Sequence, residues 1–150
     1  MGFSVSGATA VVFIGLLISA STLYPAVEQY SERRSEAIDA RDERSLTMRN
    51  TAIDITSATV TDPDTADNTK TLTVVVDNDG ASTLAVSKTD LLVDGTYRIP
   101  DSSTVDGTAA TDVWASGETL ELTLIIDDSA SPTQVKVVTG PGIAATAEVT

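Results

Sequence analysis

The chain of 150 residues contains no cysteine, no histidine and only six aromatic residues. Without cysteine it has no disulfides, and without cysteine and histidine it lacks the commonest zinc ligands. The usual nucleophile–base pairs of acyl-transfer enzymes and the GxSxG motif are missing too. Carboxylates are so abundant that a glycosidase-type pair carries little information. The composition therefore argues against an enzyme and indicates no cofactor.

Charge is absent from residues 2–27, since the first charged residue is Glu28. A helix of these 26 residues reaches about 39 Å, more than the ~30 Å hydrocarbon core of a bilayer. Residues 1–27 are therefore predicted to form a transmembrane helix. The alternative is a signal peptide cleaved near residues 19–21, but no Lys or Arg precedes the apolar run.

Small and hydroxylic residues recur every three or four positions along this segment. A helix would place them on one face, where small side chains let helix backbones approach closely within lipid. The alternative is that membrane helices are rich in small residues without a specific contact. The candidate packing face consists of Ser4, Ala8, Val11, Gly15, Ser19 and Thr22.

Residues 28–50 carry six acidic and five basic side chains and no glycine or proline. This pattern predicts a charged helix with a narrow apolar stripe. A solvated helical stalk is favoured over a coiled-coil seam. Pro25 lacks an N–H, so a kink or a restart of the helix is expected there.

From Thr51 onward apolar and polar residues alternate, and turn residues recur about every ten positions. Residues 51–150 are therefore predicted to form an all-β domain, an antiparallel β-sandwich of seven or eight short strands. Trp114 is expected in its core or rim rather than as a ligand platform. The expected irregular features are a bulge near Ser57, tight hairpin turns at 77–80 and 94–95, a turn at 140–142 and a loop over 100–112.

One polar loop contains Asp62, Asp64, Asp67 and Asn68. Oxygen ligands of this kind hold hard cations such as Ca²⁺. The loop lacks the EF-hand spacing and its closing Glu, so a solvated turn is favoured and no metal site is predicted.

The net charge is −13, and residues 51–150 hold sixteen acidic residues against four basic ones. Nucleic acid is disfavoured as a partner because phosphates require clustered Lys and Arg. An acidic, lysine-poor β domain stays soluble when salt screens its self-repulsion, so we interpret the composition as that of a halophilic organism. The alternative is an acidic face made for one basic partner.

Five segments stand out as characteristic of one family. They are MGFSVSGATA at residues 1–10, LYPAV at 23–27 before the charged helix, VVDNDG at 75–80, LVDG at 92–95 and WASGET at 114–119. Together they resemble the archaellum protein F family, especially its haloarchaeal members. The similarity covers the whole chain. A hydrophobic start and similar strand turns also occur in the related G protein and in archaellins.

The resemblance implies a non-enzymatic component of the archaellum, the archaeal flagellum that drives cell motility. Its helix would lie in the cell membrane as a single pass, with an immunoglobulin-like β domain outside, in the pseudoperiplasm. That domain would bind the S-layer protein, act with archaellum protein G, associate with itself as a homodimer and serve as the stator.

Two other functions remain as alternatives. The first is a filament subunit of the archaellin or pilin type, which carries a basic residue and Gly before its apolar stretch; no Lys or Arg precedes Phe3 here. The second is a membrane-tethered ligand-binding domain or enzyme, which requires a pocket with two close, desolvated carboxylates. The orientation is also open, because Arg33, Arg34, Arg41 and Arg44 follow the span and favour the cytoplasm for that side.

Overall fold

The computed structural model describes the backbone of residues 3–62 and 68–150, and within the helix it leaves the side chains of 3–6 and 22–27 undescribed. The chain forms two compact units, one ending at Glu43 and the other running from Arg44 to Thr150. The first unit is helical. The second holds the end of the helix and all of the β structure.

Helix α1 spans Phe3–Arg49. Its backbone is helical through Pro25, so the expected restart is wrong. The absence of glycine and proline over 28–49 explains why the charged half continues without a break, and the predicted charged helix is confirmed. Among the residues that the structure describes, no helix is both long enough and apolar enough to cross a membrane. The division between an anchor and a stalk at residue 27 stays a prediction.

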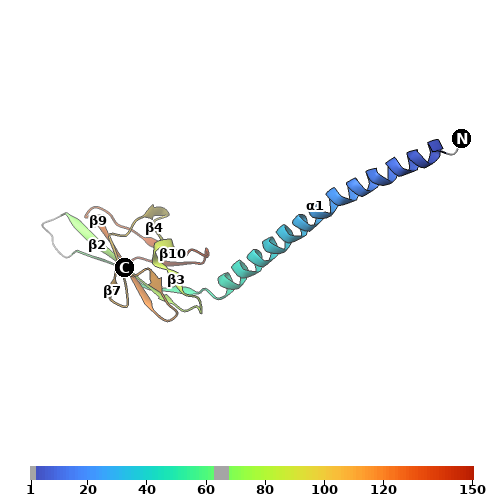
Figure 1. Cartoon of the computed structure of the whole chain (residues 1–150). Coiled ribbons are helices and arrows are strands. Elements are labelled where there is room, and N and C mark those ends of the chain that lie inside the picture. Colours follow the sequence, from blue (N-terminus) through green and yellow to red (C-terminus); the bar gives the residue numbers. More distant parts are fainter. Residues whose placement is uncertain (1–2, 63–67) are drawn as a thin grey trace. The chain divides into compact units, whose positions relative to one another are not determined.

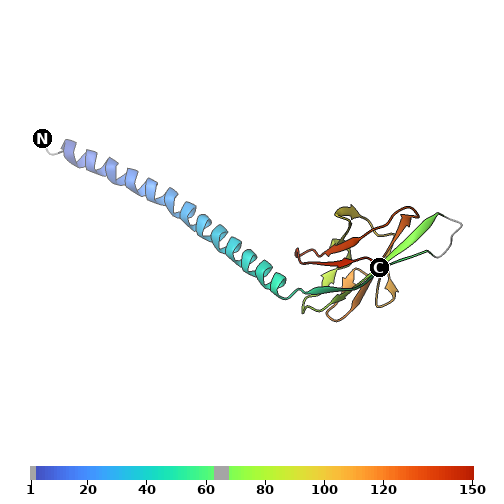
Figure 2. The same ribbon diagram turned by 180° about the vertical axis from the view of Figure 1, so that it is seen from behind.

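The strands form antiparallel sheets (Figures 1 and 2). The larger sheet has the order β1 (Ile53–Thr61), β2 (Thr69–Asn78), β9 (Thr119–Asp127), β6 (Ser102–Val105), β7 (Thr108–Ala109). The second has the order β11 (Ala144–Glu148), β10 (Gln134–Val138), β4 (Asp90–Val93), β5 (Thr96–Arg98). A short ladder joins β3 (Leu84–Ala85) to β8 (Val113–Trp114), and the 3-10 helix η1 spans Val86–Lys88. The expectation of an antiparallel β domain after the helix is confirmed.

The strand order matches that of immunoglobulin-type sandwiches. In their order across each sheet, β1, β2, β9 and β6 take the places of strands A, B, E and D, and β4, β10 and β11 those of C, F and G. The two sheets also meet at one edge, where Val60 N donates to Thr150 O (3.0 Å) and Thr150 N donates to Ala58 O (2.9 Å). The predicted bulge is confirmed, because the β1–β2 register shifts between Ile55 and Ser57.

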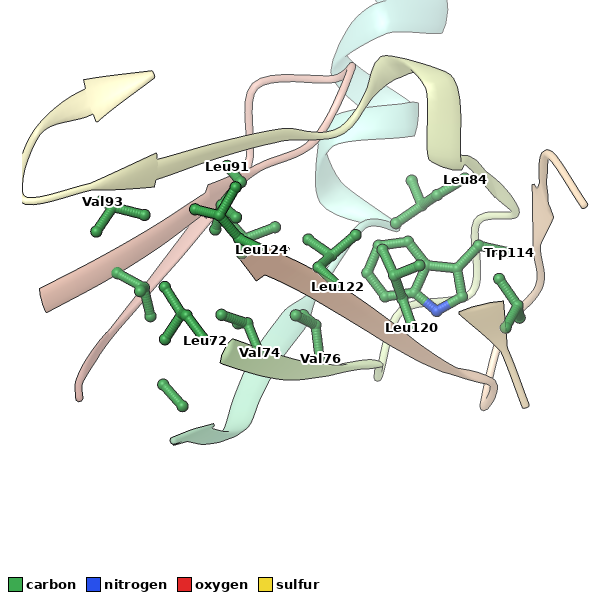
Figure 3. Close-up of a cluster of buried hydrophobic side chains, with 14 residues drawn as sticks. Leu72, Val74, Val76, Leu84, Leu91, Val93, Trp114, Leu120, Leu122 and Leu124 are labelled. Atoms are coloured by element: carbon green, nitrogen blue, oxygen red, sulfur yellow. The ribbon is translucent and has the colours of Figure 1, made fainter. Parts of the chain in front are cut away.

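The core lies between the sheets and is built by the alternating residues of their central strands (Figure 3). Trp114 is completely buried at one end of the cluster, and Val93 lies at the opposite end. Burying each such side chain contributes about 1.5–3 kcal/mol. The buried members of this core are Ala58, Leu72, Val74, Val76, Leu84, Leu91, Val93, Val105, Trp114, Leu120, Leu122, Leu124, Val135 and Val137.

Two sequence expectations about connections are wrong. The turn at 77–80 does not join a hairpin, because β2 pairs with β1 and β9 while β3 pairs with β8. The stretch 100–112 is not one loop, because it contains the β6–β7 hairpin with its turn at Asp106 and Gly107. Both turn residues have positive φ, 46° and 77°. The hairpin at 94–95 is confirmed as the β4–β5 turn.

Candidate functional site where the chain enters the β domain

The end of β2 carries a buried amide that organises three separate stretches of chain. The side chain of Asn78 has no solvent exposure. Its Nδ2 donates to the carbonyls of Ser82 (2.9 Å), Trp114 (3.2 Å) and Ala115 (3.1 Å), and its Oδ1 accepts from Gly80 N (3.2 Å). A buried polar group of this kind is stable only when it is hydrogen-bonded, and every polar atom of this side chain has a partner.

The turn after β8 packs against the same amide. Trp114 Nε1 donates to Glu118 O (2.8 Å), and Ala115 N donates to Glu118 Oε2 (2.7 Å). The backbone of Asn78 donates to Glu118 O (3.1 Å) and accepts from Gly117 N (2.8 Å). Gly117 has φ of +81°, a conformation in which glycine is favoured. Trp114 is thereby fixed both by packing and by its indole N–H.

The loop after β2 in turn holds the chain that leaves α1. Gly80 N donates to Ala52 O (3.0 Å), while the backbone N–H groups of Ala81 and Ser82 both donate to Asn50 O (2.8 and 3.1 Å). A Cβ on Gly80 would lie 2.5 Å from Asn50 O, so only glycine allows this approach. Residues 50–52, 78–82 and 114–119, which we call the junction, all lie in the unit 44–150.

The last turn of the helix is also tied to the junction. Thr51, the first residue after Asn50, is 6% exposed, and its Oγ1 donates to Thr47 O (2.8 Å). Ser116 Oγ donates to Gly80 O (2.5 Å) and Thr119 Oγ1 to Asp77 Oδ1 (2.7 Å), which links the two loops side by side. A force on residues 44–49 therefore reaches the β sheets through a hydrogen-bonded connection rather than a flexible linker.

Three of the segments that carry the resemblance lie in the β domain, and the structure brings two of them together, 75–80 and 114–119. The segment 92–95 forms the β4–β5 turn instead, where Asp94 Oδ1 accepts from Thr133 N, Thr133 Oγ1 and Gln134 N. These three donors hold the pKa of the Asp94 carboxyl below its ordinary value. Sequence reasoning missed the contact of Gly80 with residues 50–52, since Gly80 marks a close approach and not a positive φ.

The predicted helix-packing residues lie on α1. Ala8, Val11, Gly15 and Ser19 are exposed along the described helix, whereas the side chains of Ser4 and Thr22 are not described. Ser19 Oγ donates to Gly15 O (2.9 Å), as serines in apolar helices often do. The packing face stays a prediction.

The candidate cation loop is described only in part. Asp62 and Asn68 are exposed, while Asp64 and Asp67 lie outside the described residues. Within residues 3–62 and 68–150, no three acidic, cysteine or histidine side chains cluster in a way that would hold a metal ion.

Comparison with models of protein families shows which family this chain belongs to. Residues 2–149, covering both α1 and the β domain, match the archaeal-type flagellin family. The chain belongs to the archaeal-type flagellin family. A search of curated proteins gives no match.

Membership in the archaeal-type flagellin family confirms the resemblance to the archaellum protein F family, which falls within this archaellum-related group. The chain is therefore an archaellum-associated protein of a structural family. The junction lies inside the matched region.

Proposed function

We propose that the protein is a membrane-anchored, non-enzymatic stator component of the archaellum, of the F type. Its β domain lies outside the cytoplasmic membrane, in the pseudoperiplasm, binds the S-layer protein and acts with archaellum protein G. The observation that carries this proposal is the junction. A static anchor must pass load from one grip to another, and the three backbone hydrogen bonds to Asn50 and Ala52 couple the helix to the sheets.

The membrane grip is assigned to residues 1–27. The uncharged stretch 2–27 supports this assignment, as do the exposed apolar side chains of α1. The side chains of Val11, Val12, Phe13, Ile14, Leu16 and Leu17 are each more than half exposed, which is costly in water and favourable in lipid. The small-residue face would then pack against a second copy or against protein G.

A tethered enzyme receives no support from the carboxylates beside a hollow in the described part of the domain. Asp94 and Asp127 lie there, and each has a pKa below its ordinary value. Hydrogen bonds from Thr133 lower the pKa of Asp94, and those from Ser129 lower the pKa of Asp127. General acid catalysis needs a raised carboxyl pKa, so this arrangement favours a binding domain.

The alternative function is a filament subunit, which the match to the archaeal-type flagellin family favours. Two measurements separate the functions. A filament subunit would be a major component of filaments sheared from cells, and its mature amino terminus would begin within residues 3–8. A stator would remain with the cell envelope and keep residues 1–27.

The stator role is tested by deleting residues 51–150 while α1 is retained. Cells should still assemble filaments but swim poorly, because the outer grip is lost. The matched control is the full chain expressed from the same promoter in the same deletion strain. Full swimming with the truncated protein would rule out the role. Cross-linking in native membranes should capture the S-layer protein only when residues 51–150 are present.

The orientation is tested by protease accessibility in intact cells. Cleavage of residues 51–150 from outside is expected. Protection of that domain in intact cells, with cleavage after lysis, would place it in the cytoplasm as the Arg residues after the span favour.

A further inference from the structure

The space between the two sheets is open beside β5. A hollow of about 470 Å³ lies there, which we call the β5 slot. It is at the end of the core marked by Val93, away from Trp114 (Figure 3). Its volume is in the range of ligand-binding pockets. Its apolar lining includes Val93, Leu124, Ile126 and Pro132, and its polar lining includes Thr96, Arg98, Asp94 and Asp127.

The slot exists because β5 closes its sheet poorly. β5 is an edge strand of three residues, all exposed. Thr96 pairs with Val93 and Arg98 with Leu91, and both partners point into the core. Thr96 and Arg98 therefore face the inter-sheet side, where their polar ends cannot complete the apolar packing.

The free edge of β5 also offers backbone groups. Asp94 N donates to Gln134 O on the β10 side (2.9 Å). In an antiparallel ladder the N–H and C=O groups of successive residues point alternately to the two neighbouring strands, so those of Leu92, two residues before Asp94, also point toward β10. The partner of Leu92 on β5 is Tyr97, so the N–H and C=O of Tyr97 point away from β4. An unpaired edge of this kind is a template for another strand.

Among the charged groups that line the slot, the guanidinium of Arg98 has no ion-pair partner in the described part of the chain. Arg98 is one of four basic residues in 51–150, and its guanidinium forms no hydrogen bond or ion pair with the described part of the chain. The ionised carboxylates of Asp94 and Asp127 also line the slot, but their hydrogen bonds go to Thr133, Gln134 and Ser129 and neither forms an ion pair with Arg98. The guanidinium can therefore bind an incoming carboxylate in bidentate fashion.

We propose that β5 and the slot bind an extended acidic segment of a partner protein. The segment adds a strand to the free edge of β5, inserts an aliphatic side chain into the slot and places a carboxylate on Arg98. Alternate residues of that strand cover the outer face, where Tyr97 is 56% and Ile99 73% exposed.

This occupant accounts for the free edge, the slot and the unpaired guanidinium together. Backbone groups at the edge, a partly apolar slot on one face and exposed apolar side chains on the other correspond to the alternating side chains of one added strand. A small ligand would use the slot without the edge. The inference does not depend on the stator role, because the test uses a synthetic peptide.

The probe is a fluorescein-labelled, acetylated and amidated heptapeptide TTLTDTT, whose leucine and aspartate share one face of a strand. Its neutral counterpart is TTLTNTT. Fluorescence anisotropy with the purified full chain in detergent, at low salt, should show at least tenfold tighter binding of the acidic peptide. Arg98→Gln should abolish this preference. The matched control Lys88→Gln, which removes a basic residue outside the slot, should keep it.

The edge is tested with Tyr97→Pro against Tyr97→Val. Proline removes the outward N–H while the β4–β5 pairing is kept, and it is tolerated on edge strands. Tyr97→Pro should weaken peptide binding at least tenfold relative to Tyr97→Val. Should the proline variant misfold, a peptide methylated at every backbone nitrogen provides the same test and should bind at least tenfold more weakly than TTLTDTT.

Three results would overturn the proposal. They are no binding of TTLTDTT up to 1 mM, equal binding of the acidic and neutral peptides, and equal losses from Arg98→Gln and Lys88→Gln. Sedimentation of the full chain provides a fourth. A dimer that Tyr97→Pro abolishes and Tyr97→Val retains would show that a second copy occupies the edge.

Discussion

The amide of Asn78 contacts four backbone groups, three through its nitrogen and one through its oxygen. Replacing it by alanine leaves buried carbonyls of Trp114 and Ala115 with fewer partners. Each unsatisfied buried group costs about 1–3 kcal/mol, so Asn78→Ala should lower the free energy of unfolding by about 3 kcal/mol. Urea unfolding of the full chain at pH 7 measures this loss.

The variant Asn78→Asp separates hydrogen bonding from packing, because it keeps the shape and replaces the donor by a carboxylate oxygen. Burial beside three carbonyl oxygens would raise the pKa of the new carboxyl above its unfolded value. Its protonated form donates, so the variant should approach the unmodified chain at pH 4 and lose stability as the pH rises to 7. Asn78→Ala is the control, and its loss relative to the unmodified chain should not depend on pH.

Asp94 gives a second pH-dependent prediction, with the opposite sign. The backbone and hydroxyl of Thr133 and the backbone of Gln134 hold the pKa of the folded carboxyl below its ordinary value. The stabilisation is therefore present above the unfolded pKa and is lost as the pH falls through the folded one. Asp94→Asn should lower the melting temperature at pH 6–8, and the difference should vanish near pH 2. Asn tolerates the φ of +48° found here, so backbone strain is unchanged.

Single residues were the hardest features to predict from sequence. Asp94-Gly95 was recognised, because two positive φ values in a two-residue turn have a strong signature. Asn78 looked like an ordinary turn residue, since asparagine is mostly exposed and nothing local signals that Trp114 lies next to it. Arg98 was not singled out, because its importance comes from a guanidinium that forms no ion pair in the fold, and the sequence alone does not show this.

At the scale of elements, the junction depends on the close approach of the loop after β2 to the end of α1. Gly80→Ala would place a Cβ 2.5 Å from Asn50 O and 2.6 Å from Ala52 N, both backbone atoms that cannot rotate away. We expect a loss of about 2–3 kcal/mol in the free energy of unfolding. Trypsin should also cleave after Arg49 much faster, because the end of the helix opens locally.

The control for Gly80→Ala is Gly117→Ala in the same junction. An added Cβ there meets nothing within 4 Å, and only the φ of +81° is unfavourable, at a cost of about 1 kcal/mol. Cleavage after Arg49 should hardly change in this control. Equal cleavage rates in the two variants would show that the approach of Gly80 does not hold the helix.

Elements with a strong period were predictable. In β9 the residues Leu120, Leu122 and Leu124 alternate with polar ones, and all three are buried. β6 was missed because serine and threonine precede its single buried residue, Val105, and this short segment shows no alternation of apolar and polar residues. It is a strand because it pairs with β9, a contact that the local sequence does not indicate. The crossing from β2 to β3 was misread as a hairpin because turn chemistry reports a reversal but not the partner strand.

At the scale of the whole molecule, the junction and the β5 slot are both in contact with the core of the β domain. The junction fixes the chain where it enters the sandwich, near Trp114 at one end of the core, and the slot lies at the other end, near Val93 (Figure 3). A partner bound at β5 would thus be connected to residues 44–52 through the packed core rather than through a loop. Close packing lets such a core transmit strain.

The charge of the whole domain leads to the last prediction. Residues 51–150 contain sixteen acidic and four basic residues, and the described side chains form one salt bridge, Lys70–Asp128 at 3.1 Å. Repulsion is therefore largely unbalanced, and screening should relieve it. Raising NaCl from 0.1 to 1 M shortens the Debye length from about 10 to 3 Å. We expect the melting temperature to rise by roughly 5–10 °C, equivalent to about 1–2 kcal/mol.

A variant with four aspartates changed to asparagine isolates the contribution of charge. Asp54, Asp62, Asp79 and Asp90 are exposed, and none of their carboxylates forms a hydrogen bond or ion pair within the described residues. Their replacement should raise the melting temperature at 0.1 M NaCl and reduce its further rise with salt, because less repulsion remains to be screened. Calorimetry of both proteins in matched detergent measures the two slopes. Equal slopes would mean that salt acts through exclusion from the protein surface, as sucrose does, and not through the acidic residues.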